Sequence, residues 1–128
     1  MSTLTGTITG YVVGDDLEIR RTVTDLPDAI ANAWLTVKRH NREADEDAVV
    51  SKEIDEDDAP GVGRIEVDGG VGADATLRFD LTPTDTTALG DSDWVYDIQV
   101  KLDDGTVYTP EVGTVTLTAD VTRSTTPS

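Results

Sequence analysis

Carboxylates are almost the only side chains of this 128-residue chain that are suited to chemistry. The sequence holds 26 acidic residues against 10 basic ones, which gives a formal net charge of −16. It has no cysteine, so thiol nucleophiles, disulfides and zinc–thiolate sites are excluded. His40 is the single histidine, and its polar neighbours indicate a solvated loop residue. Because carboxylates occur throughout, a nearby pair carries no information about acid–base catalysis, and we expect no enzyme.

The densest acidic run is Asp55-Glu56-Asp57-Asp58, which is followed by Gly61. Its oxygen atoms are of the kind that Ca²⁺ and Mg²⁺ prefer as ligands. The spacing differs from that of an EF-hand loop, and no glutamate stands where the bidentate ligand is needed. Asp55, Asp57 and Asp58 are therefore only weak metal candidates. A solvated acidic loop that contacts a neighbouring subunit is the favoured interpretation, and no cofactor is predicted.

The acidity is spread over every segment of the chain, and this has two interpretations. One is a specific acidic surface for a basic partner or for cations, and the other is general acidity that ambient salt screens. The even spread, the preference for aspartate and the scarcity of lysine favour the second, and they resemble the composition of haloarchaeal proteins. No basic stripe is present, so we expect no nucleic-acid binding.

No apolar run approaches the roughly 20 residues of a membrane span, so no membrane association is predicted. Met1-Ser2-Thr3 is followed by neither a basic segment nor an apolar block, so we also expect no Sec-type signal peptide.

The clearest structural pattern lies in residues 93–122. Apolar and polar residues alternate from Trp94 to Leu102, which predicts a strand with one buried face. Asp104-Gly105 predicts a two-residue hairpin turn, in which Leu102 faces Val107. After Pro110 and Gly113 a third strand is expected, with Val115, Leu117, Ala119 and Val121 on one side.

Shorter alternating runs precede this region. Residues 4–13 predict a strand or an extended arm, and residues 29–33 a loop or a single turn. Val49 to Ile54 predicts an edge strand whose charges, Lys52 and Glu53, face solvent. Thr82 to Leu89 predicts one helical turn with Thr82 as N-cap, Pro83 first and Asp85 in the third position. Further strands are expected at residues 17–24, 34–39, 65–67 and 76–81.

Seven to nine short strands separated by turns are typical of a β-sandwich. The fold class predicted is therefore all-β, an immunoglobulin-like antiparallel β-sandwich without the immunoglobulin cysteine pair. We expect an N-terminal strand or arm over residues 1–13, the sandwich over 14–122 and a polar tail over 123–128. Trp94 and Trp34 are both better explained as core, although Trp34 has the alternative of an interface anchor.

Several segments together resemble a known family. They are Gly14-Asp15-Asp16-Leu17, the strand from Trp34 to Arg39, the LTPTDTTAL segment from Leu81 to Leu89, and the YDIQV strand from Tyr96 to Val100 with its glycine hairpin and final DVT. The chain is similar to an immunoglobulin-like structural module of tailed bacteriophages, such as the N-terminal domain of the lactococcal upper baseplate protein. The resemblance implies a virion component in head, neck or tail. With the acidic composition, it implies a tailed virus of a halophilic archaeon.

We therefore expect a non-enzymatic virion structural protein, made in the host cytoplasm, whose partners are other virion proteins and further copies of itself. Contacts are expected through strand edges, the N-terminal arm and the acidic loops. In a specific version, Leu4, Ile8, Tyr11 and Val12 pair with a neighbour's open sheet edge.

Two alternatives stay open. A receptor- or glycan-binding module on the virion surface is disfavoured by the aromatic content of 5%. A carboxylate-based glycosidase would need a cleft that a chain of this size can hardly build.

Overall fold

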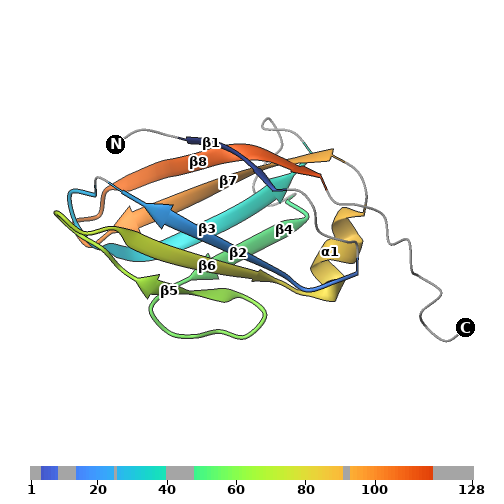
Figure 1. The fold of residues 1–128 in the computed structure, drawn as a ribbon, viewed down its shortest axis with the longest axis horizontal. Helices are drawn as coiled ribbons and strands as arrows, with labels where there is room; N and C mark the ends of the chain where they lie inside the picture. The colour runs from blue at the N-terminus through green and yellow to red at the C-terminus, as the bar shows by residue number, and fades with distance from the viewer. Residues whose placement is uncertain (1–3, 9–13, 25, 40–47, 91–92, 117–128) are drawn as a thin grey trace, which may run out of the picture.

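The computed structural model describes residues 4–8, 14–24, 26–39, 48–90 and 93–116. These residues form two packed sheets (Figure 1). The larger sheet has five strands in the order β1-β8-β7-β3-β4, and the smaller has three in the order β2-β6-β5. The strands are β1 Leu4–Ile8, β2 Leu17–Val23, β3 Ile30–Lys38, β4 Val50–Ile54, β5 Gly63–Val67, β6 Ala75–Leu81, β7 Asp93–Leu102 and β8 Val107–Thr116.

All strand pairs are antiparallel except β1 with β8, which is parallel. The arrangement β8-β7-β3-β4 opposite β2-β6-β5 corresponds to the G-F-C-C′ and B-E-D sheets of an immunoglobulin variable-type domain. The prediction of an all-β, immunoglobulin-like sandwich is therefore confirmed.

The core fills the space between the two sheets, where alternate residues of each strand point inward. Phe79, Leu77, Leu35 and Ile98 are among its fully buried side chains. The predicted inward rows of β6 and β7 are confirmed, because Leu77, Phe79 and Leu81 are buried, as are Tyr96, Ile98, Val100 and Leu102. Val107 and Val112 are the largest exposed apolar side chains on β8.

The helix α1, Pro83–Leu89, closes one end of the sandwich between β6 and β7 (Figure 1). Its capping box is formed as predicted. The Thr82 hydroxyl accepts a hydrogen bond from the Asp85 N–H at 3.2 Å, and the Asp85 carboxylate accepts one from the Thr82 N–H at 2.8 Å. Leu89 is buried beneath the sheet. No helix of the described residues is long and apolar enough to cross a bilayer.

The prediction of a loop over residues 29–33 is wrong, because β3 begins at Ile30. Ile30 and Ala33 are buried, and the Ile30 N–H donates to the carbonyl of Asp68 at 2.9 Å. Burial and pairing across the sandwich thus outweigh the weak strand propensity of this alanine-rich segment.

The predicted hairpin register is wrong by one residue. Lys101, not Leu102, lies opposite Val107, and the Leu102 N–H donates to the Thr106 carbonyl at 2.9 Å. The turn therefore has three residues and ends on Gly105, whose φ of 89° suits glycine. The Asp104 side chain supports it by accepting from the Thr106 N–H at 2.9 Å.

The expected break after Pro110 is also wrong, because β8 runs continuously from Val107 to Thr116. A bulge stands there instead: Ile98 pairs with Glu111 and Val100 with Tyr108, so Gln99 faces both Thr109 and Pro110. Pro110 cannot donate a ladder hydrogen bond, which suits this position. As a consequence Pro110 and Glu111 are both buried although they are consecutive. Leu117, Ala119 and Val121 lie outside the described residues, as does the polar tail.

Candidate functional site

The β1 edge of the five-stranded sheet rests on a buried polar contact that joins the two sheets. The Tyr96 hydroxyl, from β7, donates to the Glu111 carboxylate of β8. Arg21, from β2 of the other sheet, donates through Nε to both Glu111 oxygens, at 2.9 and 3.1 Å. Glu111 is 8% exposed and Tyr96 is 3% exposed. The bulge at Pro110 is what turns the Glu111 side chain toward the interior.

The surroundings fix the protonation of Tyr96 and of Arg21 in this contact. Burial, together with the neighbouring Glu111 carboxylate, raises the pKa of Tyr96 to about 12. Burial alone would lower the pKa of Arg21, but its interactions with Glu111 and Tyr96 together outweigh burial and raise it. The phenol therefore stays a donor and the guanidinium stays charged at ordinary pH. The group acts as a structural contact.

β1 lies over this contact through a pair of glycines. Gly6 of β1 pairs in register with Gly113 of β8. A Cβ at Gly6 would collide with the Tyr96 hydroxyl and would lie 2.7 Å from a Glu111 oxygen. A Cβ at Gly113 would collide with the carbonyl of Gly6. The Tyr96 ring therefore occupies the space that side chains of the two strands would need.

The structure places the predicted interface residues at different positions. Leu4 and Ile8 lie in β1, which pairs with the β8 of its own chain opposite Glu111 and Val115. Ile8 is buried in the core. Tyr11 and Val12 lie outside the described residues. Trp34 is half-buried on the outer face of the five-stranded sheet, in register with Glu53 and Gln99, so the core interpretation is wrong for its orientation.

Trp94 is half-buried and packs against the core, as predicted. Its indole N–H donates to the Leu89 carbonyl at 2.7 Å, which ties β7 to α1. The guanidinium of Arg39 lies 5.9 Å from the centre of its ring, within cation–π range.

The opposite edge, β4, is closed by a charge that points inward. Lys52 pairs with Leu35, so its side chain lies on the core side between Val50 and Ile54. Its ammonium group lies 2.7 Å from the Asp85 carboxylate of α1 and donates to the Gly61 carbonyl at 2.8 Å. The prediction that β4 is an edge strand is confirmed, but the prediction that Lys52 faces solvent is wrong.

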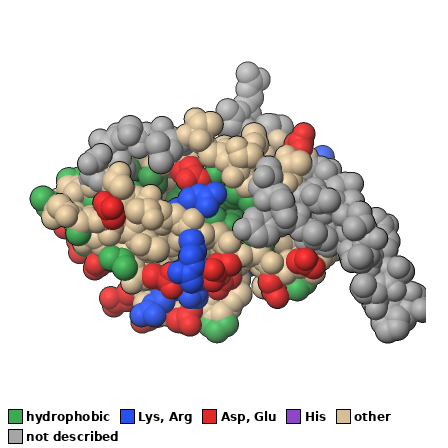
Figure 2. Space-filling model, in the orientation of Figure 1, with side chains coloured by type: hydrophobic (Ala, Val, Ile, Leu, Met, Phe, Trp, Pro, Cys, Tyr) green, Lys and Arg blue, Asp and Glu red, His purple; other side chains and the backbone are tan. Residues whose placement is uncertain are grey.

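The outer face of the three-stranded sheet carries a row of three arginines, Arg20, Arg78 and Arg64, which are direct neighbours on β2, β6 and β5. Such like-charge neighbours repel unless acids separate them. Figure 2 shows basic and acidic side chains gathered over this sheet.

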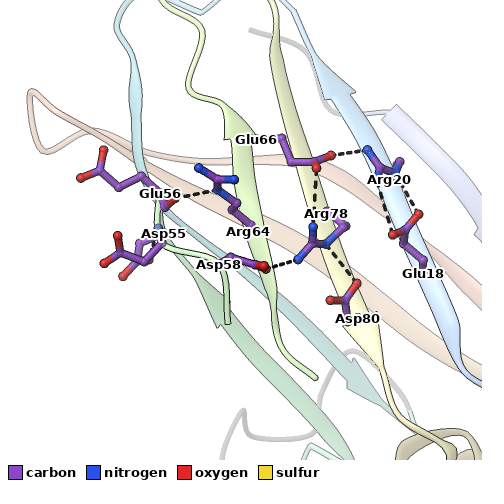
Figure 3. Close-up of polar contacts among 10 residues, drawn as sticks. Glu18, Arg20, Asp55, Glu56, Asp58, Arg64, Glu66, Arg78 and Asp80 are labelled. Carbon is purple, nitrogen blue, oxygen red and sulfur yellow. Dashed lines mark hydrogen bonds and ion pairs between the residues drawn. The ribbon is translucent and has the colours of Figure 1, made fainter. Parts of the chain in front are cut away.

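Carboxylates surround this arginine row (Figure 3). Arg78 contacts Asp58, Glu66 and Asp80, and Arg20 contacts Glu18 and Glu66. The hydrogen bond to Asp58 raises the pKa of Arg78. Arg78 Nε lies 3.2 Å from Asp80 but is not aligned for a hydrogen bond. Four carboxylates therefore contact Arg20 and Arg78, whereas Arg64 Nε donates to the backbone carbonyl of Glu56 at 2.8 Å. The charges of Arg20 and Arg78 are thus neutralised locally, and these two side chains are not a ready anion site.

The three weak metal candidates do not form one site. Asp58 is engaged by Arg78, whereas the Asp55 side chain accepts from the Asp57 N–H at 2.9 Å in a local turn. Asp55 and Asp57 line a hollow of about 290 Å³ together with Glu56, Asp68 and Asp103. Within the described ranges, no group of three or more His, Cys, Asp or Glu side chains is placed to hold a metal ion. His40 lies outside those ranges.

A second hollow, of about 320 Å³, lies on the outer face of the five-stranded sheet. Residues of β3, β7 and β8 line it, among them Thr36, Lys38, Asp97 and Val112.

Comparisons with known proteins add little to this picture. No protein-family model and no curated protein matches the chain. Among solved structures, the chain is similar to one in the crystal structure of ICOS in complex with ICOS-L and an anti ICOS-L VNAR domain. The TM-score is 0.35 with 13% sequence identity, and the match covers 92% of this chain and 56% of that chain. The chain thus spans little more than half the length of that relative, and the likeness carries no argument about function.

Proposed function

We propose that the chain is a non-enzymatic structural protein in the virion of a tailed virus of a halophilic archaeon. In this role it assembles with further copies and other virion proteins through subunit contacts. The sequence resemblance to the phage module and the acidic composition suggest the setting. The single structural observation that supports an assembly role is the contrast between the two edges of the five-stranded sheet.

The β4 edge has the features by which proteins prevent strands from adding to a sheet. Lys52 points inward within it, and Glu53 is exposed. The β1 edge, LTGTI, has no charge and no proline, and Thr5 and Thr7 are exposed on it. An uncharged edge strand is a template for intermolecular pairing, and a protein that must assemble has reason to keep one.

The surface charge supports the halophilic part of the proposal. The net charge is −16, and two of the 10 basic residues, Arg20 and Arg78, neutralise acids locally on the arginine row. Self-repulsion of the remaining acids is screened to a few ångström only in about molar salt. In this proposal, high salt allows copies of so acidic a chain to approach one another.

The direct test is protein mass spectrometry on purified particles of the source virus. The proposal expects peptides of this chain in the particle fraction, in a fixed ratio to the major capsid protein. Sedimentation of the purified chain in molar salt should also show assembly that increases with concentration. A chain that is absent from particles and monomeric at every concentration would contradict the proposal.

The hollow on the outer face of the five-stranded sheet favours a second candidate, a receptor- or glycan-binding module. Thr36 and Asp97 give it polar groups, and Val112 gives it an apolar wall. A glycan array in molar salt separates the two. Binding that is lost in Val112→Asp would support this candidate, and an array without binding would remove it.

A further inference from the structure

Tyr96, Glu111 and Gly113 form the surface on which β1 lies, here called the seat of β1. This seat accepts only a strand with glycine at one position. Gly6 lies over the Tyr96 hydroxyl and the Glu111 carboxylate, and any larger residue there would collide with them. Position 113 of β8 also requires glycine, because the backbone of Gly6 occupies the space that a side chain at position 113 would need. The register is therefore specified by fit as well as by the apolar pattern.

The seat is built entirely by residues outside β1. Glu111 of β8 is held by Arg21 of β2 and by Tyr96 of β7, so three different strands of the sandwich body supply these groups. Gly6 contributes no side chain to this contact. If β1 left, no buried charge would lose its partner, because these three groups satisfy one another.

The departure of β1 would therefore have a limited cost. The loss consists of the parallel ladder from Leu4 to Ile8 and the burial of Ile8, which is 3% exposed in the folded chain. Thr5 and Thr7 are already exposed. Parallel pairing is also slightly weaker per residue than antiparallel pairing.

We propose that β1 is exchanged between copies, so that Leu4–Ile8 of one chain pairs with β8 of another in the register seen within one chain. This inference rests on the proposed assembly function and names its contact. The occupant is a second copy, because its β1 carries glycine at the required position and regains every contact that it left. Exchange of an identical element is a low-cost route to association, and the high local concentration in an assembly favours it.

The test uses the absence of cysteine from the native chain. Thr7 and Thr114 are register partners on β1 and β8, and both are exposed. Two full-length single variants, Thr7→Cys and Thr114→Cys, are mixed while reduced, concentrated in molar salt and then oxidised. A disulfide between the two different chains requires β1 of one chain to lie on β8 of the other, at the spacing that a disulfide demands.

The matched control replaces Thr114→Cys by Thr116→Cys, which lies two residues along the same strand and is also exposed. The proposal expects a mixed disulfide dimer with Thr114→Cys and none with Thr116→Cys. Circular dichroism of each reduced variant establishes that it is folded. The double variant Thr7→Cys/Thr114→Cys, oxidised while dilute, should form the bond within one chain and so verify the register.

The other outcomes overturn the exchange and separate it from the proposed function. A dominant disulfide between two Thr7→Cys chains means that β1 strands pair edge to edge while each stays in its own sheet. Assembly in sedimentation without either disulfide places the contact elsewhere. Both results leave an assembly protein without strand exchange, whereas a chain that is monomeric under all conditions removes both proposals.

Discussion

The two open sides of the sandwich are each closed by a basic side chain that points inward from an edge strand. On one side, Arg21 of β2 reaches Glu111 and, through it, Tyr96 beneath β1. On the other side, Lys52 of β4 reaches Asp85 at the start of α1. Both contacts join elements that are distant in sequence, and both lie between the sheets.

The difference lies in what each contact leaves for a further strand. Lys52 belongs to the edge strand itself, so its charge stays at the edge and opposes the addition of another strand. The Arg21 contact lies below the edge, and the strand above it supplies only glycine at the point of contact. The β4 edge therefore disfavours the addition of a strand, whereas the seat of β1 binds one.

The largest expected effect comes from removing the centre of the seat. Glu111→Ala leaves the Arg21 charge and the Tyr96 hydroxyl without their shared acceptor, and we expect a loss of about 3 kcal/mol in the free energy of unfolding. Urea unfolding in molar salt measures it. Glu53→Ala, at an exposed position of β4, is the matched control and should change stability little. Equal effects of the two variants would mean that the two edges are not different in kind.

The loss of stability at alkaline pH tests the contribution of Tyr96. The phenol has a pKa of about 12 in the folded chain against an ordinary value of 10.0. Because the folded value is higher, its stabilising contribution is complete below pH 10 and is lost as the pH rises toward 12. The contribution is on the order of 2 kcal/mol. Urea unfolding between pH 9 and 12 should therefore show a steeper loss in the native chain than in Tyr96→Phe, and parallel curves would contradict the burial of a neutral phenol.

A smaller effect is expected on the β4 side. Burial raises the pKa of Asp85, but hydrogen bonds from Lys52 and Thr82 outweigh burial and leave it below its ordinary value of 3.8. The stabilisation is thus complete well above pH 3.8 and is lost as the pH falls through the lower folded value. Asp85→Asn should lose about 1 kcal/mol near neutral pH, because it removes the charge that accepts from Lys52 and from the Thr82 N–H. As the pH falls, the free energy of unfolding of the native chain should approach that of Asp85→Asn. A difference between the two that stays constant down to pH 2 would refute the stabilising role of the Asp85 carboxylate.

The smallest effect belongs to the arginine row. Arg20 and Glu18 have side chains that are 52% and 51% exposed, so solvent screens their attraction. Arg20→Gln should shift the urea midpoint less than any variant above and should leave assembly unchanged. A shift as large as that of Glu111→Ala would mean that the exposed face, and not the seat of β1, holds the sandwich together.

The fold was predictable where local pattern and turn chemistry agree. Period-two alternation identified the inward rows of β6 and β7, and the sequence Thr82-Pro83 with Asp85 identified the capped start of α1. The errors have two physical origins. The start of β3 depends on pairing with distant strands, which a local pattern does not contain. The hairpin register and the bulge at Pro110 depend on the length of the turn and on an extra residue in β8, which the alternation of apolar residues does not reveal.

The site was only partly predictable from the sequence. Residues 4–13 were predicted as a strand or arm that pairs with a neighbour, and the pairing of β1 with β8 of its own chain was not predicted. Arg21 and Lys52 each stand within an otherwise apolar row, and this signal could have indicated an inward charge. Nothing local indicated Glu111, because its orientation depends on the bulge that sets Gln99 against two residues. The role of Gly6 likewise depends on Tyr96, which lies 90 positions further along the chain.

The most direct measurement compares one molecule with its β1 locked and unlocked. The full-length Thr7→Cys/Thr114→Cys variant, oxidised while dilute, holds β1 on its own β8, and a reductant releases it. We predict that sedimentation of the concentrated protein in molar salt gives a monomer when oxidised and an assembly when reduced. The same molar mass in both forms would contradict the account, because copies would then associate, or fail to associate, without any movement of β1.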